Sequence, residues 1–212
     1  PTLDALIKAG HKVVGVVTQP DRRRGRGKKL VPSPVKKRAQ ELQLPVFTPE
    51  CIARQIDIQD DLNNLNADIS IVVAFGQILP LEVLKQPPLG CWNGHGSLLP
   101  RWRGAAPIQW SIISGDSLTG ICIMAMEEGL DTGPVLLYKD IEIKLLDNSL
   151  SLALTLSEMT ARLMIEALER IYKVGPGSQL DRWEKLGVIH QNELNGEVSY
   201  ARQITKKDKM IN

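Results

Sequence analysis

Aromatic residues, clustered cysteines and long apolar runs are all scarce in this sequence of 212 residues. Phe, Trp and Tyr together make up 4% of the chain, so aliphatic side chains must fill most of the interior. No segment approaches the roughly 18 consecutive apolar residues of a membrane-spanning helix. The N-terminal stretch is short, mixed and acidic at Asp4, unlike a secretory signal. We therefore expect a cytoplasmic protein that does not bind a membrane.

The cysteines lack the spacing that would indicate a shared role. Cys51, Cys91 and Cys122 are odd in number and far apart, and they do not match a metal-ligand motif. We expect reduced thiols in the core and no bound metal. The hydrophobic content of 43% and the charged content of 24% are ordinary for a globular protein, and the length is sufficient for a sizeable core.

Strand-like and helix-like segments alternate along the chain. Nearly continuous β-branched runs at 12–18 and 68–74 are typical of buried parallel strands. Apolar spacing predicts the longest helix at 149–174. Further strands are expected at 44–47, 91–93, 119–126 and 135–143, and further helices at 2–9, 34–42, 52–65 and 107–114. The pattern predicts an α/β fold with an open, mostly parallel, Rossmann-like sheet and helices on both faces.

Acidic residues are nearly missing between positions 20 and 38, where positive charge accumulates. Asp21 is the single acid in this stretch, and Gly25 and Gly27 disfavour a helix. The run does not have the spacing of a phosphate-binding P-loop. It is either a solvated loop or an arm that binds nucleic-acid phosphates, and we favour the arm because loops beside a site often carry function. The basic residues are Arg22, Arg23, Arg24, Arg26, Lys28, Lys29, Lys36, Lys37 and Arg38.

Three polar side chains in the central region are candidates for catalysis. Asn93 and His95 are two residues apart, so at a strand end they would point to one face, about 6.5 Å apart along the backbone. An amide beside an imidazole is suited to a developing oxyanion. Asp131, in a Gly-rich turn, could reach His95 and keep it protonated. The alternative is that these residues only end a strand and form turns, as short polar residues near glycine often do.

The motifs around these residues resemble those of the folate-dependent formyltransferases, and the similarity extends along the whole chain. The motifs are Asn93-x-His95-x-Ser97-Leu98-Leu99-Pro100, Arg103-Gly104-Ala105-Ala106-Pro107-Ile108 and Gly129-Leu130-Asp131-Thr132-Gly133-Pro134. The resemblance implies transfer of a formyl group from 10-formyltetrahydrofolate, with Asn93, His95 and Asp131 as the catalytic set. We expect direct attack by an amine, with the oxyanion held by Asn93 and His95 and with proton transfer assisted by Asp131.

The resemblance also implies a folate pocket. Residues 75–79 are expected to line it, and backbone groups of the 126–133 link are expected to bind the pterin ring. Alternatively, Ile78 and Leu79 belong to the core and Gly76 only turns the chain. The residues expected to contact the folate are Phe75, Gly76, Gln77, Ile78, Leu79, Ser97, Leu98, Leu99, Pro100, Met126, Glu127, Glu128 and Gly129.

The basic run matches an inserted loop in family members that act on tRNA. The resemblance therefore implies that the acceptor is the α-amino group of methionyl initiator tRNA, in translation initiation. The alternatives are a formyltransferase acting on a nucleotide sugar or glycinamide ribonucleotide, and a non-enzymatic RNA-binding protein. Arg101, Trp102 and Arg103 either meet the aminoacyl end or pin their loop to the body. The expected tRNA contacts are Arg22, Arg23, Arg24, Arg26, Lys28 and Lys29.

The family pattern also predicts the domain organisation. Members have a first strand and a Gly-Thr-Pro turn ahead of the helix at 2–9, and these are missing here. We expect residues 1–195 to form the catalytic domain, and residues 196–212 to form an extended tail towards an absent C-terminal β-barrel domain. We also expect a monomer.

Overall fold

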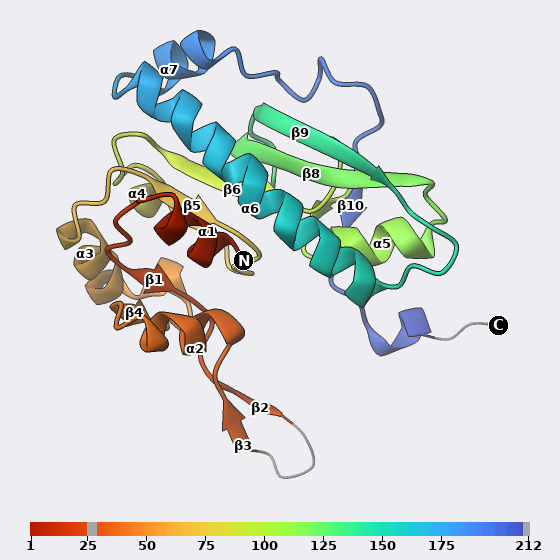
Figure 1. Cartoon of the computed structure of the whole chain (residues 1–212), viewed down its shortest axis with the longest axis horizontal. Helices are drawn as coiled ribbons and strands as arrows, with labels where there is room; N and C mark the ends of the chain where they lie inside the picture. The colour runs from red at the N-terminus through yellow and green to blue at the C-terminus, as the bar shows by residue number, and fades with distance from the viewer. Residues whose placement is uncertain (25–28, 210–212) are drawn as a thin grey trace.

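A computed structural model describes residues 1–24 and 29–209 as an α/β fold built on a four-stranded sheet (Figure 1). The strand order is β5-β6-β8-β9, and the strands are β5 (Ser70–Val72), β6 (Cys91–His95), β8 (Leu118–Ala125) and β9 (Val135–Glu142). The β5 and β6 strands are parallel, whereas β6–β8 and β8–β9 are antiparallel. The predicted α/β class is confirmed. The sheet is mixed, with one parallel and two antiparallel pairings. The β8–β9 pairing is antiparallel because the link between these strands is too short for a crossover.

The smaller sheets each contain two strands. The β1 strand (Val16–Val17) runs parallel to β4 (Val46–Phe47), and β7 (Arg103–Gly104) runs parallel to β10 (Tyr200–Ala201). The β2 (Arg22–Arg24) and β3 (Lys29–Val31) strands form an antiparallel hairpin. The strand predicted at 12–18 is wrong in length, because only the short β4 offers it backbone partners in the described part of the chain. The strand predicted at 68–74 is likewise reduced to β5.

The helices agree with most of the predicted ranges. The 26-residue helix α6 has the predicted bounds, because Asn148 caps its first turn through Leu150 and Ser151 and Gly175 follows its last residue. The helix predicted at 52–65 is split at Gln55, whose φ of −105° and ψ of 84° are not helical. The helices are α1 (Thr2–Lys8), α2 (Pro34–Glu41), α3 (Ile56–Asn64), α4 (Leu81–Leu84), α5 (Pro107–Ile113), α6 (Ser149–Val174) and α7 (Gln179–Leu186), with 3₁₀ turns η1 (Ile52–Arg54) and η2 (Lys206–Lys209).

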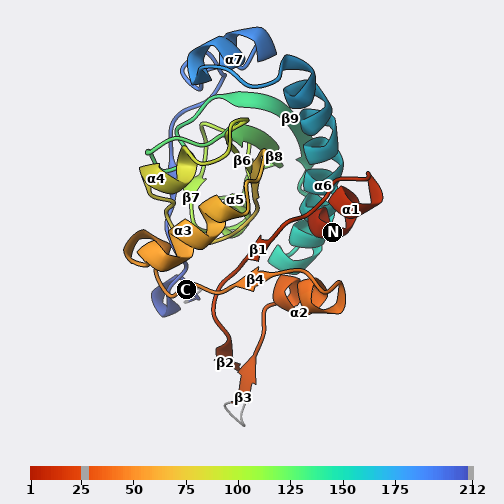
Figure 2. The ribbon, with the colours of Figure 1, turned by 90° about the vertical axis from the view of Figure 1, so that its left-hand side faces the viewer.

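Helices cover both faces of the sheet, with α1 and α6 on one side and α3 and α4 on the other (Figure 2). Trp92 belongs to the core cluster beneath α6, and Cys91 belongs to the cluster beneath α4. Gly94 also faces α6, since a Cβ atom there would lie 2.4 Å from Cγ2 of Thr160. Because side chains alternate along a strand, Asn93 and His95 point away from α6. The long helix therefore supports the strand that carries both candidate side chains.

The cysteines are unpaired, as expected, and two of them are deeply buried. Burial raises the pKa of Cys91 to about 11 and that of Cys122 to about 12, so neither is an activated nucleophile. Cys51 is only half-buried, unlike the core position expected for it. Within residues 1–24 and 29–209, no His, Cys, Asp and Glu side chains cluster in a way that could hold a metal ion. No helix in the same ranges is long and apolar enough to cross a membrane.

Candidate active site

Asn93, His95 and Asp131 meet at the carboxyl end of β6. Asn93 and His95 are on one face of the strand, as predicted, and they are 8% and 5% exposed. Asp131 lies in the link between β8 and β9. Its Oδ1 atom accepts a hydrogen bond from Nδ2 of Asn93 at 3.3 Å, and its Oδ2 atom lies 3.6 Å from Nδ1 of His95. The Asp131 carboxylate therefore bridges the amide and the imidazole.

The imidazole of His95 is held by the protein on both sides. Its Nε2 atom lies 2.9 Å from the backbone carbonyl of Trp102. Because a carbonyl oxygen can only accept, Nε2 carries a hydrogen. The Nδ1 atom therefore faces Asp131 either as a free lone pair or as an N–H group beside a carboxylate. The 3.6 Å separation makes the contact with Asp131 an electrostatic one, and the Trp102 carbonyl fixes the orientation of the ring.

The backbone around Asp131 is fixed by a residue that the sequence analysis missed. Asp131 has a φ of +53°, in the left-handed region that side chains seldom occupy. Nε2 of the buried Gln191 donates to the carbonyls of Asp131 and Gly133, both at 2.8 Å. Oε1 of Gln191 accepts two hydrogen bonds from Arg103, at 2.9 and 2.7 Å. No motif marks Gln191, because its role depends on contacts distant in sequence.

Replacing Gln191 by leucine is expected to lower stability by about 1–3 kcal/mol, because buried carbonyls and the Arg103 guanidinium lose their partners. The turn that presents Asp131 should loosen, so turnover should fall more than substrate binding. Chemical denaturation and steady-state kinetics measure the two effects. Gln203→Leu, at an exposed position nearer the C-terminus, is the control. Unchanged stability and turnover in Gln191→Leu would contradict the proposed clamp.

The loop that follows β6 is pinned to the body by its own charged and aromatic side chains. Arg101 donates to both oxygens of Asp116, at 3.0 and 2.6 Å, and Nε1 of Trp102 donates to the same carboxylate at 2.7 Å. Burial raises the pKa of Asp116, but the hydrogen bonds from Arg101 and Trp102 outweigh burial and hold that pKa below its ordinary value. The structure thus shows the pinning role for Arg101, Trp102 and, through Gln191, Arg103.

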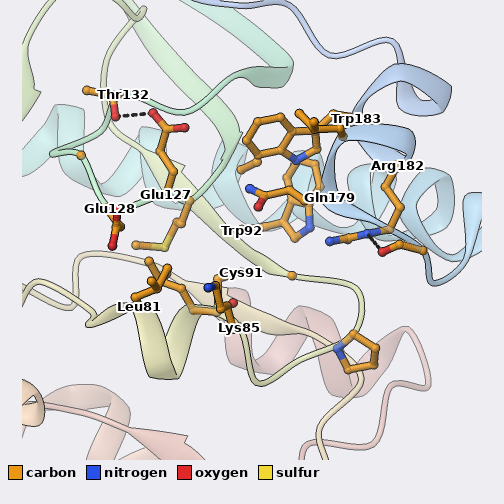
Figure 3. Close-up of a pocket in the computed structure, with 18 residues that line it drawn as sticks. Leu81, Lys85, Cys91, Trp92, Glu127, Glu128, Thr132, Gln179, Arg182 and Trp183 are labelled. Carbon is orange, nitrogen blue, oxygen red and sulfur yellow. Dashed lines mark hydrogen bonds between the residues drawn. The ribbon is translucent and has the colours of Figure 1, made fainter.

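A cavity of about 830 Å³ lies between β6, α4, α7 and the β8–β9 link (Figure 3). Four of the expected folate residues line it, namely Met126, Glu127, Glu128 and Gly129. Thr132 donates to Oε1 of Glu127 at 2.6 Å, which orders this wall. Leu81 and Leu84 form part of the wall contributed by α4. The link that carries Asp131 therefore also borders the cavity.

The expected folate residues in 75–79 do not line this cavity directly. Phe75 and the buried Leu79 pack in the core cluster that also contacts Met126. The core interpretation is thus confirmed for Leu79 but wrong for Ile78, which is 71% exposed. Gly76 has a φ of +74°, as a turn glycine does. Gln77 accepts from the amide of residue 52 at 2.8 Å and donates to the carbonyl of residue 49 at 2.9 Å.

Residues 97–100 also lie outside the cavity lining and shape the loop instead. Oγ of Ser97 donates to the carbonyl of Arg101 at 2.6 Å. Leu99 is buried against Cys122 and its neighbours. Leu98 packs against the face of Gly120, and Pro100 follows a cis peptide bond. The side chains of this motif therefore position the chain between His95 and Trp102.

The basic hairpin projects away from the sheet (Figures 1 and 2). Arg22 and Arg23 are exposed on β2. Nη2 of Arg22 donates to Gln19 at 3.0 Å, and Nε2 of Gln19 donates to the carbonyl of Phe75 at 2.7 Å. Arg24 is the last residue of β2 and Lys29 is the first residue of β3, whereas Arg26 and Lys28 lie outside the described residues. Arg22 and Arg23 thus extend into solvent on an arm anchored beside residue 75.

The architecture is that of an α/β protein with a polar cluster at the carboxyl end of a strand, where such folds bind ligands. A family profile described as "Formyl transferase" matches residues 1–168. The chain belongs to the formyl transferase family.

Relatives of this chain include proteins named methionyl-tRNA formyltransferase. The protein from Synechococcus sp. strain WH7803 is 63% identical over 212 residues, and that from Prochlorococcus marinus strain MIT 9313 is 59% identical over 211 residues. Both matches cover 100% of this chain but 62% of the relative. The chain therefore spans about three-fifths of the length of these relatives.

Solved structures share the fold at low identity. A phosphoribosylglycinamide formyltransferase from Streptococcus pneumoniae TIGR4 has a TM-score of 0.68 and 18% identity, covering 81% of this chain and 92% of that one. The sugar 3N-formyltransferase WlaRD, solved with dTDP and 5-N-formyl-tetrahydrofolate, has a TM-score of 0.65 and 17% identity, covering 100% and 66%. At such identities the likeness confirms the formyltransferase-like fold and not the substrate.

Proposed function

We propose that this chain is the catalytic part of a methionyl-tRNA formyltransferase. The reaction transfers the formyl group of 10-formyltetrahydrofolate to the α-amino group of methionyl initiator tRNA. The observation that carries the proposal is the convergence of Asn93 and His95 on Asp131. The names of the relatives and the exposed basic hairpin support tRNA as the acceptor. The protein would act in the cytoplasm, as a monomer.

The attacking group is a neutral amine. A free α-amine titrates near pH 7.7–8.0 as a typical estimate, so its neutral form is accessible without an activated protein nucleophile. Asn93 uses one hydrogen of its amide on Asp131 and offers the other to the oxyanion of the attacked carbonyl. Protonated His95 supplies positive charge to the same place. These two groups stabilise the tetrahedral intermediate.

Asp131 is positioned to accept the proton that the attacking amine loses. Its carboxylate accepts from the amide N–H of Gly104 at 2.8 Å and contacts both Asn93 and His95, so its orientation is fixed. It can take the amine proton directly or through a water molecule. The reduced folate leaves as an amine and needs a proton, which the Asp131–His95 pair can return.

We assign the folate to the cavity that borders the link carrying Asp131. The backbone of 126–129 borders the cavity beside Asp131, and its amide groups would pair with the pterin ring. Residues 75–79 would support the folate site through the adjoining core cluster. Residues 97–100 would support it through the loop that follows β6. Residues 1–195 would form the catalytic domain, with 196–212 as a tail whose strand β10 pairs with β7 of that domain.

The basic hairpin is expected to select tRNA. Replacing Arg22, Arg23, Lys28 and Lys29 by alanine should raise the KM for methionyl-tRNA and make its logarithmic salt dependence shallower by about three, because each lost phosphate contact removes roughly 0.7–0.9 from the slope. Folate binding should be unaffected. The measurements are formylation rates at several salt concentrations and a folate titration.

A matched set of exposed lysines away from the hairpin, Lys139, Lys144, Lys173 and Lys185, controls for net charge. Equal losses of tRNA use and folate binding in the hairpin variant would indicate a structural loop instead. A substrate panel tests the acceptor. Faster transfer to an amino nucleotide sugar or to glycinamide ribonucleotide than to charged initiator tRNA would overturn the proposal, and tRNA binding without any transfer would favour the RNA-binding alternative.

A further inference from the structure

A buried arginine without a charged partner lies at the α7 end of the cavity. Arg182 is 7% exposed, and its Nε atom donates to the carbonyl of Gly177 at 3.2 Å. Its Nη1 atom has no hydrogen-bond partner in the described part of the chain. No carboxylate among residues 1–24 and 29–209 forms an ion pair with it. The positive charge is therefore uncompensated by the protein described.

Arg182 lines the cavity, and Gly90, which also lines it, lies against the guanidinium group. A Cβ atom on Gly90 would lie 3.3 Å from Nη1 and 3.4 Å from Nη2 of Arg182, so a larger residue would crowd the group. Gly90 also has a φ of +83°, which favours glycine. Lys85 lines the same cavity and adds a second positive charge (Figure 3). The cavity wall at this end thus carries two cations, and the backbone of Gly90 approaches the guanidinium group without a side chain to cover it.

Burying such a charge destabilises the folded protein unless a partner compensates it. Burial lowers the pKa of Arg182, which expresses the same unfavourable solvation. An apolar side chain would pack beside Trp92 and Trp183 without that cost. The two planar N–H groups of a guanidinium match the oxygen atoms of a carboxylate or a phosphate. An anionic ligand would supply the missing partner.

We propose that Arg182, assisted by Lys85, forms an anion-binding subsite for the carboxylate or phosphate group of a small molecule that enters the cavity. Glu127 and Glu128 line the opposite end, so repulsion directs the anionic group towards α7 (Figure 3). Asn93, His95 and Asp131 are not among the residues that line the cavity. The subsite is therefore separate from the three catalytic side chains, and only its assignment to the folate carboxylates rests on the proposed function.

Thermal melting and tryptophan fluorescence test the subsite in the whole chain. The probes are sodium phosphate, 5-formyltetrahydrofolate, and a reduced pterin without the benzoylglutamate tail, all against chloride at equal ionic strength. In the wild type, phosphate or the folate should raise the melting temperature, because ligands that bind only the native state stabilise it. Arg182→Met should weaken that binding roughly tenfold to a hundredfold, through loss of a charged hydrogen-bond pair. Without ligand, its melting temperature should equal or exceed that of the wild type.

Lys185→Met removes an exposed charge from the same helix and should leave each response unchanged. Arg182→Lys keeps the charge and should retain part of the response even if the methionine variant folds poorly. Asn93→Ala should retain the full phosphate response. If phosphate binding depends on Arg182, the subsite binds a separate anion. If only folate binding depends on Arg182, the subsite binds the folate carboxylates. Equal responses in wild type and Arg182 variants, or no response to any probe in the wild type, would overturn the proposal.

Discussion

Asp131→Asn is expected to lower the rate of formyl transfer at least about a hundredfold, because a neutral amide cannot accept the amine proton or hold a charged imidazole beside it. The fold should remain. The side-chain oxygen of asparagine can still accept the hydrogen bond from Gly104, which the aspartate accepts at 2.8 Å. The measurement is single-turnover transfer of labelled formyl to charged initiator tRNA, together with thermal melting.

Two further variants distinguish the loss of the Asp131 charge from a general charge effect and from a loss of local structure. Asp140→Asn removes an exposed carboxylate from β9 and should leave the rate unchanged. Asp131→Ala should also lower stability by about 1–3 kcal/mol, because the Gly104 N–H group loses its partner. A wild-type rate in Asp131→Asn, with the fold intact, would show that this carboxylate does not take part in the reaction.

Gly94→Ala is expected to lower stability by about 1–3 kcal/mol, because the added methyl group overpacks the contact between β6 and α6. Its position would be 2.4 Å from Cγ2 of Thr160, which is buried and cannot move freely. Relief of the clash requires β6 to shift, and β6 carries Asn93 and His95. Activity should therefore fall as well. Denaturant unfolding and formylation kinetics measure the two effects.

A second-site change tests whether the clash is the cause. Thr160→Ser removes Cγ2 but keeps the hydroxyl that donates to the carbonyl of Leu156 at 2.8 Å. Combined with Gly94→Ala, it should restore most of the stability and activity, while Thr160→Ser alone should have a small effect. A double variant that is no better than Gly94→Ala would place the cause elsewhere.

Local signals predicted the elements that depend on local contacts. The bounds of α6 follow from a capping asparagine, a terminal glycine and a continuous apolar face. The strand at 12–18 was predicted too long, because β-branched composition does not reveal how much partner strand is available. The short helix α7 was missed because the predominantly polar 179–186 segment contains only a few apolar residues.

The same contrast holds for the candidate site. Alternation along a strand predicted that Asn93 and His95 share a face, the Gly-rich turn suggested Asp131 as their partner, and the motif resemblance joined the three as a catalytic set. The supporting contacts were not predictable in this way. The carbonyl of Trp102 belongs to the backbone, and Gln191 is distant in sequence from the turn that it holds. Such contacts become apparent only when the chain is folded.

The pairing of β10 with β7 makes the tail an integral part of the structure beside Asp131. The amides of Trp102 and Arg103 donate to Ser199, and those of Ala105 and Ala106 donate to the carbonyl of Ala201. A protein shortened at the predicted boundary of 195 would leave all these N–H groups without their partners. The smallest self-sufficient fragment must therefore extend at least to residue 201.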